Sequence, residues 1–484
     1  MTKSASSSVT LDTCKDTLST SQNIAYALPA MSNSFILGPV YLIQGIYAMY
    51  FGLSLTTIGT VLFLSRLFDA ITDPLIGHIS DRLRNRRAFI VCGGILMIIS
   101  AYFLLVPVDP ASLNASTKVS EMYFLLCFFT FYLSQTLFDI PHMAWGSELA
   151  KTSDEKNSIF AWRSAALYFG ALLFYCVPFL PVFKTREITP HTLQWAAIIG
   201  GFLMLMMLLV SMRTLHDRGK NERPSMTPKP SLAMFLANKP LRVFMIAFLL
   251  SGISFGLFGT MFFIFVSSYL NQGTDYALIM VVSTCASILG IKIWMLLATR
   301  WEKSLLWSVG MGFMMIGVAV LAALVPEDDN FPLLLTAYVV VMFGISTTAL
   351  FGPSILSEII DYSRWKYKSD CSATFFSLFT FVGKANFALG GALGFLVAGW
   401  YGFDPAGLNH SAEAIFGLRL AAIWLPTGVG LISIIFIALI PMNKRRHATI
   451  RRYLDSTSAR SKSLKHQRAS IQNTIDENPL ASLA

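Results

Sequence analysis

Long runs of apolar residues recur along nearly the whole chain and are separated by shorter polar stretches. Most runs approach or exceed the ~20 residues that an α-helix needs to cross ~30 Å of hydrocarbon. They lack the ~10-residue alternating segments of a transmembrane β-barrel, and a helix satisfies its own backbone hydrogen bonds in lipid. The pattern predicts an all-α membrane protein with twelve transmembrane helices. The predicted spans are 24–50, 55–79, 88–106, 121–146, 158–182, 194–212, 241–270, 277–299, 305–325, 333–355, 371–399 and 414–441.

The longest polar stretch inside the chain, residues 213–240, is rich in proline and divides the spans into six and six. We interpret it as a linker between two six-helix bundles. The polar, basic and serine-rich C-terminal tail is expected to be largely disordered beyond a Lys444–Arg446 cluster that faces anionic lipid headgroups. The predicted domains are a cytoplasmic N-terminal tail (1–23), an N-terminal bundle (24–212), a cytoplasmic linker (213–240), a C-terminal bundle (241–441) and a cytoplasmic basic tail (442–484).

Composition and charge agree with a membrane protein. Only 13% of the residues are charged, about half of the ~25% typical of soluble domains. The net charge of +10 alone could indicate a nucleic-acid partner, but 29 of the 37 Lys and Arg residues lie on one predicted side of the membrane. The loops on the other side hold only Lys118, Lys184 and Arg186. The positive-inside rule therefore predicts a multi-pass protein of the cell (inner) membrane with both termini in the cytoplasm. We expect the lipid bilayer as a partner, no nucleic acid, and a monomer.

Charged residues inside the second span are the first candidates for function. The run S-R-L-F-D-A-I-T-D-P places Arg66, Asp69 and Asp73 at intervals of three and four, on one face of a helix. A charged side chain near the middle of the bilayer costs roughly 2.5 to 3.5 kcal/mol even on the lenient insertion scale. Two carboxylates one turn apart also repel each other, so this arrangement implies a compensating cation or proton.

The fourth span supplies a third carboxylate, Asp139, in T-L-F-D-I-P. If Asp139 faces the second span, three acids converge with the hydroxyls of Thr72 and Thr136, which are oxygen ligands suited to a small cation. The alternative is a buried network around Arg66 that only joins helices, but a single arginine cannot neutralise three acids. His142 lies one turn beyond Asp139 and is interpreted as a packing residue, since no second His or Cys stands at ligand spacing. Apart from a possible Na⁺, no metal site is predicted.

Two further cations lie in predicted spans, Arg163 in the fifth and Lys384 in the eleventh. Each either neutralises the acids in part or binds an anionic or polyhydroxyl solute, and the sequence leaves both options open. Trp145 is a candidate flat surface for stacking of a sugar ring.

The loop after the second span, G-H-I-S-D-R-L-R-N-R-R, is a candidate gate. Gly77 would permit a close approach of helices, and Asp81, next to Arg82, could cap a neighbouring helix N-terminus in only one conformation. A solvated run of charges is the simpler alternative.

These motifs together resemble a known family. Residues Gly77 to Arg87 resemble the loop signature of the major facilitator superfamily. The runs R-L-F-D-A-I-T-D-P, D-I-P, E-I-I-D-Y-S-R-W-K and F-S-L-F-T-F-V-G-K-A resemble the glycoside-pentoside-hexuronide:cation symporter family, over about Ile24 to Pro441. The resemblance implies two six-helix bundles and symport of a sugar, glycoside or hexuronide with Na⁺ or H⁺ by alternating access, without another cofactor.

The resemblance also implies roles for individual residues. Asp69, Asp73 and Asp139 would bind the cation with help from Thr72 and Thr136. Arg163 would be a solute ligand and Lys384 a residue of the central cavity. We group Arg66 with the conformational residues of the second span and the loop that follows it.

Two departures from the family pattern bear on the solute. Sugar-transporting relatives hold a carboxylate in the first span where this chain has Ser34, preceded by Asn33 rather than a cation. The basic loop is also shorter and lacks a tryptophan. A serine cannot accept the paired hydrogen bonds that a carboxylate accepts from sugar hydroxyls. The resemblance therefore implies a retained cation site and an altered solute site around Asn33 and Ser34.

Other functions remain as alternatives to sugar symport. Similar eukaryotic proteins carry lysophospholipids, so a cation-coupled transporter of a lipid-like solute is the main rival. A receptor or scaffold that moves nothing is a further alternative. We expect no enzyme, because the chain shows no nucleotide-binding loop, zinc pattern or nucleophile elbow.

Overall fold

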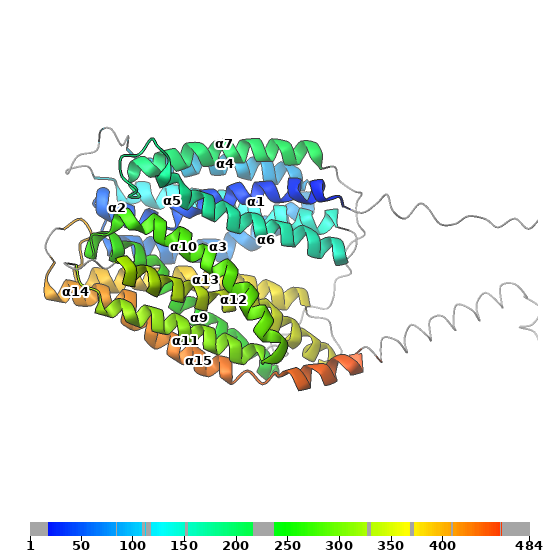
Figure 1. Cartoon of the computed structure of the whole chain (residues 1–484). Coiled ribbons are helices and arrows are strands. Elements are labelled where there is room, and N and C mark those ends of the chain that lie inside the picture. Colours follow the sequence, from blue (N-terminus) through cyan, green and yellow to red (C-terminus); the bar gives the residue numbers. More distant parts are fainter. Residues whose placement is uncertain are drawn as a thin grey trace, which may run out of the picture.

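The computed structural model describes residues 18–456 except 84, 109–111, 113–117, 151–152, 216–236, 327–330, 368–371, 408–409 and 455. Over these residues the protein is helical, and twelve helical segments are long and apolar enough to cross a membrane (Figure 1). The predicted multi-pass, all-α class and the number of spans are therefore confirmed. Most of the predicted linker and the outer parts of both tails lie outside the described residues.

The helices form two groups that lie side by side (Figure 1). The first group holds α1 (Thr20–Val40), α2 (Ile43–Tyr50), α3 (Leu55–Leu83), α4 (Arg86–Leu105), α5 (Glu121–Leu149), α6 (Ser153–Cys176), η2 (Val177–Phe179) and α7 (Pro190–Thr214). The second holds α9 (Lys239–Ile264), η3 (Phe265–Tyr269), α10 (Gly273–Arg300), α11 (Lys303–Val320), η4 (Leu321–Ala323), α12 (Phe331–Tyr367), α13 (Ser372–Trp400), α14 (Ala412–Arg419), η5 (Leu420–Trp424) and α15 (Leu425–Ala438).

Both described ends of the chain lie at the same end of the molecule, and the two groups of helices slope apart towards it (Figure 1). We call this the basic end, because most of the Lys and Arg residues that the structure describes fall in the segments that meet there. The other end is called the opposite end. We call the two groups the N-terminal bundle and the C-terminal bundle.

The first predicted span, 24–50, is broken in two. Helix α1 ends at Val40 and α2 begins at Ile43, with a turn at residues 41 and 42. Pro39 lies in the last turn of α1 and has no N–H to donate, and the Leu42 N–H closes a tight turn on the Pro39 carbonyl at 3.0 Å. Irregular backbone at membrane depth is tolerated where it lines a cavity.

The tenth span is longer than its apolar run. Helix α12 has 37 residues and is therefore about 55 Å long, well beyond the ~30 Å of hydrocarbon. It continues past the predicted end at residue 355 through the polar run E-I-I-D-Y-S-R-W-K. This extension places Glu358 and Asp361 at the basic end, where they form ion pairs.

The beginning of the C-terminal tail differs from the sequence expectation. Residues 444–454 form a helix rather than a disordered segment. His447 Nε2 and Arg451 Nη1 lie 3.1 Å and 3.3 Å from the Asp361 carboxylate, and the Lys444 N–H donates to Glu302 Oε2 at 2.9 Å. Lys444 Nζ also donates to backbone carbonyls at the end of α10. Specific acids and carbonyls of the C-terminal bundle therefore hold this segment.

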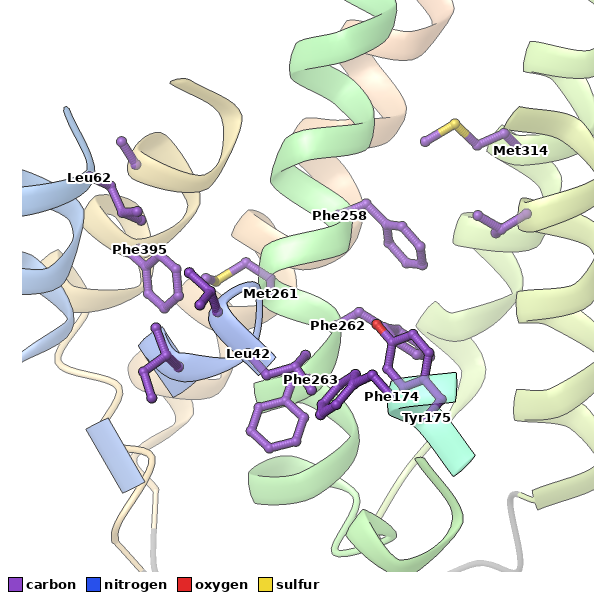
Figure 2. Packing of buried hydrophobic residues seen from close by; sticks show 14 of the residues in the cluster. Leu42, Leu62, Phe174, Tyr175, Phe258, Met261, Phe262, Phe263, Met314 and Phe395 are labelled. Carbon is purple, nitrogen blue, oxygen red and sulfur yellow. The ribbon is translucent and has the colours of Figure 1, made fainter. Parts of the chain in front are cut away.

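The two bundles pack tightly at the opposite end through apolar side chains. Figure 2 shows Leu42 beside Met261 and Phe263 of α9. A methyl group on Gly45 would lie 2.5 Å from Phe263 Cδ1, and one on Gly399 would lie 2.6 Å from Thr56 Oγ1. These glycines favour the close approach, because a side chain at either position would force its neighbour in the other bundle to shift.

Candidate cation and solute site

The acids predicted in α3 and α5 each have a basic partner. Arg66 Nη1 lies 2.8 Å from Asp69 Oδ2, as the three-residue spacing predicts. The guanidinium of Arg66 also lies over the Tyr132 ring, 4.4 Å from its centroid. Arg66 is therefore held by two neighbours beside the cavity described below.

Asp73 joins the two bundles. Its Oδ1 accepts a hydrogen bond of 2.9 Å from the Thr136 hydroxyl of α5. Its Oδ2 lies 2.5 Å from Lys384 Nζ, which comes from α13 in the C-terminal bundle. Lys384 is thus the basic residue that reaches the acids from across the interface.

Asp139 pairs with Arg163 of α6, at 2.5 Å between Oδ1 and Nη2, within the N-terminal bundle. The three acids therefore do not depend on a single arginine, since Arg66, Arg163 and Lys384 pair with one acid each. In this conformation Arg163 and Lys384 neutralise acids, the first of the two roles that the sequence left open. The formal charges of these six groups cancel.

Thr72 does not contact these acids through its hydroxyl in this conformation. It donates to the Phe68 carbonyl one turn earlier at 3.1 Å, a common arrangement for Thr inside a helix. Asp69 Oδ1 is buried and has no hydrogen-bond partner among the described residues. The structure contains no group of three His, Cys, Asp or Glu arranged for a metal, within the described part of the chain.

Three of the predicted solute residues lie inside the N-terminal bundle. The Ser34 hydroxyl donates to the Leu167 carbonyl at 2.6 Å, and Asn33 is buried. Trp145 is only 1% exposed, and its ring packs near Tyr26. His142 is also fully buried and stacks on Tyr26 at 4.4 Å, in keeping with its interpretation as a packing residue.

Two of the predicted gating residues, Gly77 and Arg82, lie in the last turns of α3. A methyl group on Gly77 would meet only Ile140 Cγ2, at an ordinary 3.9 Å, so no close approach requires this glycine here. The side chain of Arg82 is exposed, and that of Asp81 lies outside the described part. The predicted loop is therefore mostly the end of α3, and Arg86, the first residue of α4, pairs with Glu148 at 3.2 Å although the sequence did not single it out.

A cavity of about 410 Å³ lies between the bundles beside the acid–base pairs. Its volume falls within the ~300–1,000 Å³ of small-molecule sites. It is lined by Leu37, Tyr41, Gln44, Leu62, Arg66, Asp69, Tyr132, Gln135, Thr260, Phe379, Thr380, Gly383, Lys384, Phe387, Ala388 and Gly391. Arg66, Asp69 and Lys384 were predicted members of the site, whereas the two glutamines and the aromatic residues were not.

Part of this lining was visible in the sequence. Gln135 precedes Thr136, and Tyr132 lies one helical turn before it, so both belong to the region already singled out in α5. Gln44 is an isolated amide in the apolar run Y-L-I-Q-G-I-Y. An uncharged polar side chain at membrane depth was the signal that could have identified it.

Comparisons with known proteins agree with this architecture. The chain is 24% identical over 453 residues to the uncharacterized symporter YjmB of Bacillus subtilis, covering 90% of this chain and 95% of that protein. It is 23% identical over 447 residues to the sodium-dependent lysophosphatidylcholine symporter 1 of Gallus gallus, covering 83% of each. The crystal structure of the nucleoside transporter NupG matches with a TM-score of 0.62 at 13% identity, covering 87% of this chain and 99% of that chain, which supports the fold. The family described as MFS/sugar transport protein matches residues 24–444, and the chain belongs to this family.

Proposed function

We propose that this protein is a secondary transporter that couples the movement of a small solute to Na⁺ or H⁺ by alternating access. Family membership supports the transporter class. The observation that carries the coupling proposal is the Lys384–Asp73 ion pair, which joins the bundles next to a cavity of solute size. Transporters of this architecture bind their solute between two bundles that rock about it. The basic end would face the cytoplasm of the cell membrane.

Asp73 is the proposed centre of cation binding. Na⁺ would bind its carboxylate with help from the Thr136 hydroxyl and the unpartnered oxygen of Asp69. H⁺ would instead protonate the carboxylate. Either ion removes the negative charge that holds Lys384, because a neutralised carboxylate no longer attracts an ammonium group. Asp139 and Thr72 are proposed to contribute only after a rearrangement, since both have other partners in this conformation.

Lys384 is the proposed link between ion and solute. Its side chain is 32% exposed and lines the cavity, so an ammonium group released from Asp73 would face the solute. Leaving it unpaired at membrane depth is costly. Solute and cation therefore favour each other's binding, and this linkage is reciprocal.

The charge balance of the site favours a solute with one negative charge. The three acids and three bases cancel, so a bound cation leaves one surplus positive charge. A hexuronide carries one carboxylate and would restore neutrality. The main alternative is a lysophospholipid, which the Gallus gallus relative favours, as it is named a sodium-dependent lysophosphatidylcholine symporter.

The test is active uptake by Asp73→Asn in proteoliposomes, with solute binding measured with and without Na⁺ and at several pH values. We expect the variant to lose uphill accumulation and to keep solute counterflow, because the cation site fails while the cavity remains. Asp404→Asn, in an exposed loop, is the matched control and should behave like wild type. Unchanged active uptake by Asp73→Asn, or wild-type binding indifferent to both ions, would reject the coupling.

A further inference from the structure

The cavity has two chemically different parts. Arg66, Asp69 and Lys384 line one part. Leu62 and Gly391 line the other, seven residues from Asp69 along α3 and seven residues from Lys384 along α13, towards the opposite end. Seven residues of α-helix span about 10 Å. The backbone positions of Asp69 and Lys384 are therefore about this length from the uncharged part, whereas Arg66, four residues from Leu62, is about 6 Å from it.

Gln44 belongs to the uncharged part. It is the second residue of α2, and a methyl group on its neighbour Gly45 would touch Phe263 near the opposite end of α9. Thr260 lies one turn before that end of α9 and also lines the cavity. A methyl group on Gly391 would lie 2.8 Å from Thr260 Cγ2, so these residues gather in one region.

The amide oxygen of Gln44 lacks a hydrogen-bond partner among the described residues. The residue is 4% exposed, and its Oε1 is buried without such a partner. Unpaired amides inside proteins are costly and are usually satisfied by protein, water or ligand. The break between α1 and α2 brings Gln44 and Tyr41 to the cavity wall together.

We propose that Gln44 is a solute-binding residue that selects a hydroxylated, glycoside-type solute over a lipid. This inference rests on the proposed transport function and assigns the solute class of the same cavity. The amide donates to and accepts from solute hydroxyl groups while the charged part of the same cavity binds an anionic group of the solute. An acyl chain in the same place would leave the amide without a partner, so lipid binding is disfavoured.

The test uses purified protein with saturating Na⁺ and three probes: methyl β-D-glucuronide, methyl β-D-glucoside and palmitoyl lysophosphatidylcholine. Gln44→Met keeps the length of the side chain and removes its hydrogen-bonding groups. We expect the glucuronide Kd to rise at least about tenfold, because the hydroxyls of the solute lose their partner. Affinity for lysophosphatidylcholine should not fall. Ile43→Met, at a buried neighbour outside the cavity lining, is the control and should stay within twofold of wild type.

Two further measurements keep the result unambiguous. Gln44→Asn retains an amide and should lose less affinity than Gln44→Met. Thermal stabilisation by Na⁺, measured on every variant, shows that the cation site and the fold persist. A Gln44→Met variant within twofold of wild type for both sugars overturns the proposal. The proposal is also overturned if the wild-type protein binds lysophosphatidylcholine but neither sugar, or if it binds none of the three probes.

Failure of the coupling mechanism is distinguishable from failure of this inference. If Gln44→Met weakens sugar binding while Na⁺ and pH change nothing in wild type, Gln44 binds solute and the coupling is wrong. If Na⁺ strengthens sugar binding equally in wild type and Gln44→Met, the coupling holds and the role of Gln44 is wrong.

Discussion

The two ends of the molecule are held by different interactions. At the opposite end, apolar side chains of the two bundles pack against each other, with Gly45 against Phe263 and Gly399 against Thr56. At the basic end, charged contacts join helices of the same bundle. In the N-terminal bundle Arg86 pairs with Glu148 at 3.2 Å, and in the C-terminal bundle Lys303 pairs with Glu358 at 2.5 Å.

This difference suggests how the protein moves. Apolar packing lacks directional bonds, so two complementary surfaces can separate and meet again without unpaired polar groups. Charge pairs within a bundle hold its helices together while the bundle moves as a body. The Lys384–Asp73 pair combines features of both ends, because it is an ion pair but joins the two bundles. Substitutions in the three zones should therefore have different consequences.

The largest effect is expected from Lys384→Met. With its ammonium group removed, Asp73 has no competing cation, so Na⁺ affinity should rise about tenfold, equivalent to ~1.4 kcal/mol. The solute should no longer change that affinity, and uphill accumulation should be lost. Isothermal titration with Na⁺, with and without solute, measures both effects. Lys303→Met removes a lysine that pairs within one bundle and should leave the linkage intact. Weaker Na⁺ binding in Lys384→Met would contradict the prediction that Lys384 and Na⁺ compete for Asp73.

An intermediate effect is expected from Gly45→Val. The new side chain would collide with Phe263, and overpacking of this kind costs about 1 to 3 kcal/mol. It should shift the population towards a conformation open at the opposite end and slow transport by roughly tenfold. The readout is labelling of a cysteine at Thr260, in a background without the six native cysteines, by an impermeant thiol reagent added to the opposite side.

The control for this prediction is Gly312→Ala, since an added Cβ there meets nothing within 4 Å. Its labelling rate and transport rate should equal those of the parent. Faster labelling in Gly45→Val but not in Gly312→Ala would support the prediction that packing of Gly45 against Phe263 closes the cavity at the opposite end. Equal labelling in the two variants would show that packing of Gly45 against Phe263 does not close the cavity.

The sequence predicted well what local pattern determines. Long apolar runs give twelve spans, and the interval from Arg66 to Asp69 gives their ion pair. Partners distant in the chain were not predictable in this way. Asp73 and Lys384 are 311 residues apart, and only the packing of α3 against α13 brings them together.

Competition for a hydrogen bond explains a second difference, at Thr72. Its hydroxyl has an acceptor in its own helix at Phe68, so its presence beside two acids did not make it their partner. The tail helix shows a further limit of composition. A basic and polar segment was expected to be disordered, but Asp361, at the extended end of α12, offers a carboxylate to His447 and Arg451. Specific pairing overrode composition over residues 444–454.

The smallest effect on transport is expected from Asp361→Asn. This variant tests whether the ion pairs at the basic end stabilise one bundle without affecting the coupling between the two bundles. Asp361 is 6% exposed and lies near His447, Arg451 and Arg364. Loss of its charge should lower the free energy of unfolding by about 1 to 3 kcal/mol, because buried hydrogen bonds to a charged group are lost. It should also free the tail helix, so trypsin should cleave after Arg451 and Arg452 faster than in wild type.

Na⁺-coupled accumulation by Asp361→Asn should stay within about twofold of wild type, because Lys444, His447 and Arg451 of the tail helix bind Glu302 and Asp361, which belong to the C-terminal bundle. Arg452→Gln, at an exposed position on the same helix, is the control for trypsin cleavage after Arg451 and should leave the tail protected there. If Asp361→Asn instead abolished coupling as Lys384→Met does, the two ends would not be independent. The basic end would then take part in the conformational change itself. The distinction between apolar packing across the bundles at the opposite end and ion pairs within each bundle at the basic end would have to be abandoned.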